Sequence, residues 1–335
     1  MLSSGSLTSL EICAGGGGQA IGVEQAGFQH VALVEQKAQA CQTLRLNRPS
    51  WQVVEMDLRN FEPERDAGIT SVDLLAGGVP CTPYSIAGHQ KGAGDERDLL
   101  PEAIRLTKTL RPRALMLENV KTLATGRSFA TVRESLIQSL EDLDYDVQFT
   151  VLDAQEFGVP QTRLRTLIVA VRKDLKKFQW PLPVWELPQT VGEVLRESMK
   201  ARGWGGADEW AQLANGIAPT IVGGSDKHGG GDLGPDRAKR RWAQMAVNGD
   251  STAEQVPGPD FVLRHGVGRG GWKGYPKLTP EQAALLQGFP PNWEFAGSRT
   301  ARYKQIGNAF PPPVACAVAS AIAEVLRETP TDQVA

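Results

Sequence analysis

The first half of the chain alternates short apolar runs with longer amphipathic runs, and this alternation limits the folds open to it. Seven short runs predict strands: LTSLEIC, HVALVE, WQVVEMD, VDLLAGG, RALMLENV, VQFTVLD and TLIVAVR. Four longer runs between them predict helices: QAIGVEQAG, KAQACQTLRLN, LLPEAIRLTKTL and FATVRESLIQSLEDL. Such alternation is typical of an α/β fold with a doubly wound, mostly parallel sheet. Ligands of these sheets bind at the carboxyl ends of the strands.

The composition changes after about residue 182. Proline, glycine and tryptophan become frequent, and stretches such as GGSDKHGGG predict loops of a smaller irregular domain. Further on, LTPEQAALLQ predicts a capped helix, and PPPVACAVASAIAEVLRE predicts a final helix whose apolar face docks on the first domain. We therefore expect a first domain of residues 1–183 plus 301–335 and a second domain of residues 184–300.

Composition narrows the functional classes. The 41% hydrophobic and 22% charged contents are ordinary for a globular protein. No apolar run approaches the ~20 residues that span a bilayer, and the N-terminus does not resemble a secretory signal. The four cysteines form no CxxC pair and no cluster with histidine, which predicts reduced thiols, a cytoplasmic location and no metal site. The net charge of −2 does not by itself indicate a nucleic-acid partner.

A glycine turn follows the first predicted strand. EICAGGGGQAIG contains the spacing Gly15-x-Gly17-x-x-Ala20, which fits NAD, FAD or S-adenosylmethionine. Glu35 ends the second strand, where it can accept hydrogen bonds from ribose hydroxyls, and Asp57 ends the third, where it can accept one from an adenine amino group. These features predict an adenosine pocket, which NAD and S-adenosylmethionine share.

A cysteine loop, GGVPCTPYSIAG, follows the fourth predicted strand and holds Cys81 between two prolines. Carbon methylation of a pyrimidine needs such a thiol, because C5 of cytosine becomes nucleophilic only after a thiolate adds to C6. Protonation of N3 assists that addition, and Glu118, followed by Asn119 at the end of the fifth strand, is the candidate acid. In FGVPQTRLR, Arg163 and Arg165 alternate on one predicted strand face, suited to O2 of the base and a phosphate.

These motifs occur in the order found in the C5-cytosine-specific DNA methyltransferases, which the chain resembles. The match includes the glycine turn, both acids, Pro80-Cys81, DLL, ENV, QTRLR, LTPEQAALLQGFP and QIGNAFPPPVA. The resemblance implies a Rossmann-like methyltransferase fold and transfer of a methyl group from S-adenosyl-L-methionine to C5 of cytosine in a short duplex DNA sequence. It also implies base flipping, a covalent Cys81–C6 intermediate and S-adenosyl-L-homocysteine as product.

The resemblance implies roles for individual residues. The catalytic set is Cys81, Glu118, Asn119, Arg163 and Arg165, of which the two arginines hold the flipped cytosine and the cysteine loop. The cofactor set is Cys13, Ala14, Gly15, Gly17, Glu35, Gln36, Asp57, Leu58, Pro80, Leu100, Asn308 and Ala309. The expected DNA contacts are Ser85, Thr220, Lys227, His228, Arg237, Arg240, Arg264, Arg269 and Lys273.

Three positions depart from the family pattern. Cys13 stands where a phenylalanine usually packs on adenine, and Gln36 stands where a large apolar residue is common. Thr82 replaces the glutamine that usually follows the nucleophile. The first two departures predict a thinner adenine clamp and a weaker cofactor affinity.

Other functions stay open at this point. Relatives that methylate tRNA share these motifs, although the size of the irregular domain favours DNA. A nicotinamide-dependent oxidoreductase shares the glycine turn but leaves Cys81 and Glu118 unexplained. A DNA-binding protein without catalysis has no support in the motifs. We expect a monomer with duplex DNA as partner, no membrane, a functional pairing with a restriction endonuclease, and association with the nucleoid if the source is prokaryotic.

Overall fold

The computed structural model describes residues 6–80, 98–184, 186–223 and 231–328. It divides into two compact units. The sheet unit comprises residues 1–152, 164–182 and 314–335, and the second unit comprises residues 153–163 and 183–313. The second unit thus contains the expected recognition domain together with residues 153–163, 183 and 301–313, which the sequence assigned to the first domain. As functional domains, these divisions stay a prediction.

The sheet unit is built on seven strands, which match the seven predicted ones. They are β1 (Leu7–Ile12), β2 (Phe28–Glu35), β3 (Val53–Glu55), β4 (Leu74–Gly78), β5 (Ala114–Val120), β6 (Tyr145–Asp153) and β7 (Leu164–Arg172), in the order β3-β2-β1-β4-β5-β7-β6. The pairs β1–β2, β1–β4, β2–β3 and β4–β5 are parallel, and β5–β7 is antiparallel. The predicted α/β fold with a mostly parallel sheet is confirmed.

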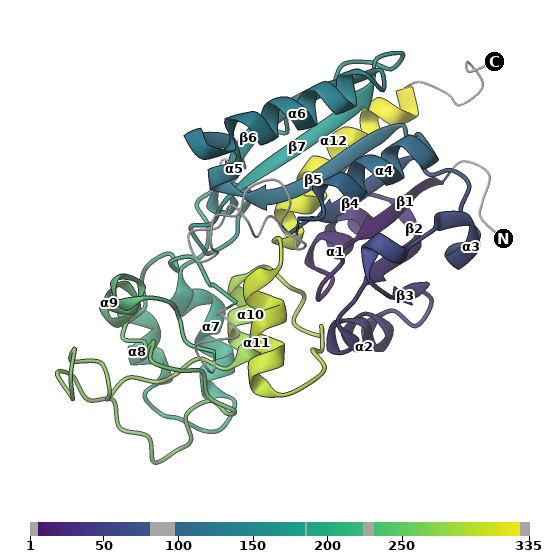
Figure 1. Cartoon of the computed structure of the whole chain (residues 1–335). Coiled ribbons are helices and arrows are strands. Elements are labelled where there is room, and N and C mark those ends of the chain that lie inside the picture. The colour runs from purple at the N-terminus through teal and green to yellow at the C-terminus, as the bar shows by residue number, and fades with distance from the viewer. Residues whose placement is uncertain (1–5, 81–97, 185, 224–230, 329–335) are drawn as a thin grey trace. The chain divides into compact units, whose positions relative to one another are not determined.

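Helices cover both faces of this sheet (Figure 1). They are α1 (Gly18–Gln25), α2 (Ala38–Asn47), α3 (Pro63–Ala67), α4 (Leu100–Leu110), α5 (Lys121–Thr125), α6 (Ala130–Glu141) and α12 (Pro312–Glu328), with short 3₁₀ turns η1 (Leu58–Asn60) and η3 (Arg127–Phe129). Helices α4 and α6 lie on the near face in Figure 1, and α12 lies behind the strands. On the near face, Leu106 of α4 and Leu136 of α6 join Leu75 and Leu115 of the strands in one buried hydrophobic cluster. Burial of these side chains fixes the sheet whose strand ends carry the candidate site.

The last helix docks on the sheet unit, as its apolar face predicted. Arg113 donates a hydrogen bond to the Leu326 carbonyl at 2.6 Å, and Val318 and Ile322 are fully buried. The run Arg299–Glu328 is long and apolar enough to span a membrane by length and composition, which the sequence analysis did not predict. However, 67% of its most apolar stretch is buried within the protein. The core helix of a soluble protein can have the same length and apolar composition.

The second unit is more regular than its composition suggested. It contains the 3₁₀ turn η4 (Ala154–Phe157) and helices α7 (Val191–Lys200), α8 (Ala207–Leu213), α9 (Asp236–Gln244), α10 (Pro280–Leu286) and α11 (Arg299–Asn308). Helix α10 is the capped helix predicted from LTPEQAALLQ: Thr279 and Gln282 form a capping box. Trp210 and Trp242 are fully buried, so the tryptophans that looked like loop residues form the core of this unit.

One buried acid stands out on β1. Glu11 has 0% of its surface exposed, and neither carboxyl oxygen has a hydrogen-bond partner in the described part of the chain. Burial raises the pKa of Glu11 well above its usual range, because an unpaired charge is costly away from water. Glu11 therefore keeps its proton to a higher pH in the folded state than in the unfolded chain.

This burial predicts a pH-dependent stability. Since the folded state holds the proton of Glu11 above the unfolded pKa of about 4.3, rising pH favours unfolding of the wild type. Glu11→Gln does not titrate, so its stability advantage should grow with pH by up to about 1.4 kcal/mol per unit. Thermal unfolding at pH 5 to 8 measures this, with Glu64→Gln, an exposed acid, as control. Curves for Glu11→Gln that run parallel to the wild type across this range would contradict the protonated state.

Candidate active site

Three strand ends meet at the point where the order of the sheet reverses. Ile12 of β1 lies beside Gly77 of β4, and Gly78 of β4 lies beside Glu118 of β5. A Cβ atom at Gly77 would collide with the Ile12 backbone, so only glycine allows this approach. The glycine turn after β1, the segment after β4 and the acid on β5 are therefore neighbours at one edge, which is where α/β sheets bind ligands.

The glycine turn has the backbone that its sequence predicts. Cys13, Gly15 and Gly17 have positive φ angles of 52°, 54° and 91°, and the Gly17 amide donates to the Ala14 carbonyl at 3.0 Å. No heavy atom of the described chain lies within 4 Å of the position a Cβ would take at Gly15. The turn thus presents bare backbone to open space, which is what close approach of a cofactor requires.

The two strand-end acids are both anchored. Glu35 is 7% exposed and accepts hydrogen bonds from the Gly15 and Lys37 amides, each at 2.8 Å. Asp57 caps η1 and accepts from the Arg59 amide at 3.0 Å. Hydrogen bonds from the Arg59 side chain lower the pKa of Asp57 below its usual value. Glu35 therefore ties the glycine turn to the end of β2, and Asp57 stays ionised.

The other predicted cofactor residues of the sheet unit differ in their burial. Leu58 and Leu100 belong to the buried hydrophobic cluster, and Cys13 packs against it. Burial raises the pKa of the Cys13 thiol, and the carboxylates Glu35 and Asp57 raise it further. Ala14 is buried, Gly15 and Pro80 are half-buried, Gln36 is exposed, and Asn308 and Ala309 lie in the second unit.

The acid Glu118 is held by an arginine. Its Oε1 lies 2.8 Å from Nε of Arg165, and both side chains are mostly buried, at 11% and 17% exposed. A Cβ at Gly78 would stand 3.3 Å from Oε2 of Glu118, so the carboxylate lies against the end of β4. Arg165 fixes the direction of the carboxylate through a charge-assisted hydrogen bond.

Asn119 has a more specific place than the sequence indicated. Its Nδ2 donates to the Val79 carbonyl at 3.1 Å, and its Oδ1 accepts from the Val120 amide at 2.8 Å. The side chain is 4% exposed. Asn119 therefore anchors the backbone immediately before Pro80. Cys81, Thr82 and Ser85, together with Lys227 and His228, lie outside the described residues.

Arg163 and Arg165 do not share a strand face, although their spacing suggested it. Arg163 precedes β7, is 1% exposed, and donates to the carbonyls of Ile221 at 2.7 Å, Gly307 at 3.0 Å and Ala309 at 2.8 Å. All of these residues belong to the second unit, whereas Arg165 belongs to the sheet unit. The structure therefore brings Arg165 to the acid and leaves Arg163 among backbone carbonyls.

Five charged residues among the expected DNA contacts of the second unit are exposed. Arg237 and Arg240 lie on α9, and Arg264, Arg269 and Lys273 lie on the loop 263–275. None of these five side chains forms an ion pair with another residue in the described ranges. By contrast, Lys239 pairs with Asp232 at 3.1 Å.

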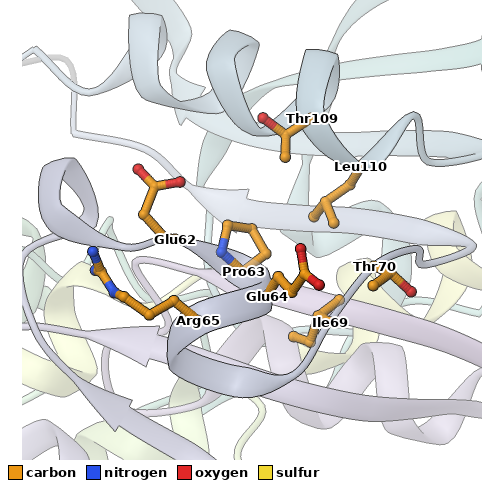
Figure 2. Close-up of a pocket in the computed structure, with 8 residues that line it drawn as sticks. All are labelled: Glu62, Pro63, Glu64, Arg65, Ile69, Thr70, Thr109 and Leu110. Carbon is orange, nitrogen blue, oxygen red and sulfur yellow. The ribbon is translucent and has the colours of Figure 1, made fainter.

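A surface pocket of about 480 Å³ lies elsewhere on the sheet unit (Figure 2). Its lining residues are Glu62, Pro63, Glu64, Arg65, Ile69, Thr70, Thr109 and Leu110, from α3 and the end of α4 with adjacent loops. None of the residues predicted for catalysis or cofactor binding lines it. The candidate site is the strand-end edge and not this hollow.

A doubly wound sheet with a glycine turn and anchored acids at the next strand ends defines an α/β protein that binds an adenosine cofactor. The profile of the C-5 cytosine-specific DNA methylase family matches residues 7–324. The chain belongs to this family. It is therefore a methyltransferase that uses S-adenosylmethionine and acts on cytosine C5 in DNA, and the oxidoreductase interpretation is wrong.

Individual relatives cover most of the chain. It is 48% identical over 323 residues to the type II methyltransferase M.NaeI of Lentzea aerocolonigenes, covering 96% of this chain and 76% of that one. It is 46% identical over 330 residues to M.NgoMIV of Neisseria gonorrhoeae, covering 96% and 98%. The Dnmt2 methyltransferase of S. pombe shares the fold with a TM-score of 0.65 at 17% identity, covering 95% and 98%.

The missing aromatic ring at Cys13 predicts a measurable loss of cofactor affinity. Cys13→Phe should tighten S-adenosylmethionine binding about 2- to 10-fold, because a ring stacked on adenine contributes about 0.5–1.5 kcal/mol. Titration calorimetry measures the dissociation constant. Cys13→Ala, which removes the thiol without adding a ring, is the matched control and should not tighten binding. An unchanged dissociation constant for Cys13→Phe would contradict the prediction that the missing ring weakens cofactor binding.

Proposed function

We propose that this protein methylates C5 of one cytosine within a specific short sequence of duplex DNA, as the modification enzyme of a type II restriction system. The observation that carries the proposal is the strand-end arrangement: Asn119 anchors the segment leading to Pro80-Cys81 beside the acid Glu118. The printed names of the most similar relatives support the restriction-system context. The partner would be an endonuclease of the same recognition sequence.

The chemistry assigned to these residues begins with Cys81. A target cytosine inside a duplex cannot reach a protein thiol, so the base must be flipped out, at a cost of a few kcal/mol that DNA contacts offset. The thiolate then bonds to C6 while Glu118, held by Arg165, hydrogen-bonds or protonates N3. Electron density moves to C5, which accepts the methyl group. A base removes the C5 proton, the C6–sulfur bond breaks, and the thiolate is released.

When bound, S-adenosylmethionine supplies the methyl group. The residues of the predicted adenosine pocket suit this cofactor. Open space above the Gly15 backbone admits the close approach, and the ionised Asp57 can accept a hydrogen bond from an amino group. Glu35 holds the turn through one carboxylate oxygen, which accepts from the Gly15 amide, while the other oxygen accepts from the Lys37 amide. We place the remaining contacts at Cys13, Ala14, Gly17, Gln36, Leu58, Pro80, Leu100, Asn308 and Ala309.

The second unit is the proposed recognition domain. Five of its exposed cations, Arg237, Arg240, Arg264, Arg269 and Lys273, form no ion pair within the described ranges, and this supports the role, because phosphate and base contacts need donors that the folded protein leaves available. Thr220, whose hydroxyl donates to the Thr162 carbonyl at 2.7 Å, is the proposed backbone contact, with Ser85, Lys227 and His228 as further contacts. We also propose that the enzyme works as a monomer in the cytoplasm, on nucleoid DNA if the source is prokaryotic.

The nucleophile is tested by covalent trapping. Bisulfite sequencing of DNA from a host expressing the protein first reveals the methylated sequence. A duplex with 5-fluorocytosine at that position should form a covalent complex with wild type in the presence of S-adenosylmethionine, because fluorine cannot leave C5 as a proton does. Cys81→Ser should bind the cofactor yet give neither trapping nor methylation above background, and Cys316→Ser, on α12, should behave as wild type. Substantial turnover by Cys81→Ser would remove the nucleophile assignment.

The basic helix α9 is tested by salt dependence. If Arg240 contacts a phosphate, Arg240→Gln should reduce the slope of log affinity against log salt by about 1. Lys239→Gln on the same helix is the matched control, since Lys239 is already paired with Asp232. Fluorescence anisotropy with the mapped duplex at several salt concentrations gives both slopes. Equal slopes for wild type and Arg240→Gln would remove α9 from the interface.

A further inference from the structure

A buried polar hub of three residues organises the second unit. Gln161, Arg163 and Gln287 are 0%, 1% and 0% exposed. Gln161 donates through Nε2 to Oε1 of Gln287 and to the Leu286 carbonyl at 3.4 Å, so two segments distant in sequence are joined by side-chain amides. A buried network of this kind is stable only when its members are paired, and it then holds the backbone in one arrangement.

One side of the hub holds the segment that leads into the recognition loops. Oε1 of Gln161 accepts from the Ile221 amide at 2.8 Å, and Nη1 of Arg163 donates to the Ile221 carbonyl at 2.7 Å. Both backbone groups of Ile221 are therefore taken by the hub. The preceding residue is Thr220, the proposed DNA-backbone contact, whose hydroxyl is bonded to the Thr162 carbonyl between the two hub residues.

The other side of the hub holds the end of α11. Nη2 of Arg163 donates to the carbonyls of Gly307 at 3.0 Å and Ala309 at 2.8 Å, and Nε2 of Gln287 donates to the Ala309 carbonyl at 2.7 Å. These carbonyls flank Asn308, the proposed cofactor contact. One guanidinium thus fixes the backbone on both sides of Asn308.

The two held segments also touch each other directly. A Cβ atom at Gly223 would collide with the side-chain amide of Asn308, and a Cβ at Gly307 would collide with the backbone of Val222 and Gly223. At Gly307 only glycine permits the packing, because the obstacle is backbone, whereas at Gly223 an added methyl group would displace the Asn308 side chain. The Thr220–Gly223 segment and Asn308 are therefore in direct contact.

We propose that Arg163 is a positioning residue that couples cofactor binding to DNA binding, and not a contact to the flipped base. This inference rests on the proposed function of Asn308 and Thr220. A cofactor that orders Asn308 also orders the Thr220–Gly223 segment through the hub and the glycine contact, so each ligand raises the affinity for the other by the same factor. The planar guanidinium suits this task, because its donors reach three carbonyls at once and a lysine ammonium lacks that fork.

The experiment measures the affinity for the mapped duplex with and without saturating S-adenosylhomocysteine, and the reciprocal affinity of S-adenosylhomocysteine with and without duplex. The ratio is the coupling factor, expected between about 5 and 150 in the wild type. Arg163→Lys should bring it close to 1. Gly223→Ala, a change in the segment assigned to DNA, should weaken S-adenosylhomocysteine binding by about 10-fold or more without DNA present, because the added methyl displaces Asn308.

The matched control is Gly205→Ala in the same unit, where no described atom lies within 4 Å of the new methyl, and it should keep wild-type values. If Arg163→Lys does not fold, Gly223→Ala decides alone. A wild-type coupling factor of 1, or wild-type cofactor affinity in Gly223→Ala, overturns the inference. Absence of methylation by the wild type instead removes the proposed function, so the two failures are distinguishable.

Discussion

The close approach of β4 to its two neighbours is the constraint on which the candidate site depends. At Gly77 the Ile12 backbone occupies the space of a side chain, and at Gly78 the Glu118 carboxylate stands against the strand. A larger residue at Gly77 would push apart the strand ends that carry the glycine turn and the segment before Pro80. The close approach of β1 and β4 therefore depends on glycine at position 77. Methyl transfer depends on such positioning, since a misplacement of about 1 Å can cost about 100-fold in rate.

The buried polar groups near the site differ in their hydrogen bonding, and this difference determines the effect of each group on the structure. Asn119 and Arg163 are almost fully buried, and their hydrogen bonds offset the loss of water while fixing particular backbone segments. Glu11 is as deeply buried but has no hydrogen-bond partner in the described ranges, and burial raises its pKa. Glu11 lies one residue before Ile12 and two before Cys13, so this buried acid comes immediately before the glycine turn in the sequence. Proteins commonly retain such local costs at functional sites.

The sequence predicted those features that depend on local pattern. All seven strands were found, because each contains a short apolar run, and Glu118 and Asn119 were found because they lie near the end of one of them. Helices α7, α8 and α11 were missed, since frequent glycine and tryptophan suggested loops. Their stability comes from tertiary burial, such as that of Trp210 in α8, which composition does not reveal. The capping box of α10 was found because its signal is contained in four adjacent residues.

The motif QTRLR shows where local pattern stops being informative. Two arginines two residues apart look equivalent, yet Arg163 bonds to carbonyls 58, 144 and 146 residues away, and Arg165 bonds to Glu118 on the neighbouring strand. The chain passes from the second unit to the sheet unit between Arg163 and Leu164. One short motif therefore supplies the organiser of the proposed recognition segment and the partner of the proposed acid. The two arginines therefore stand on either side of the boundary between the two units, with only Leu164 between them.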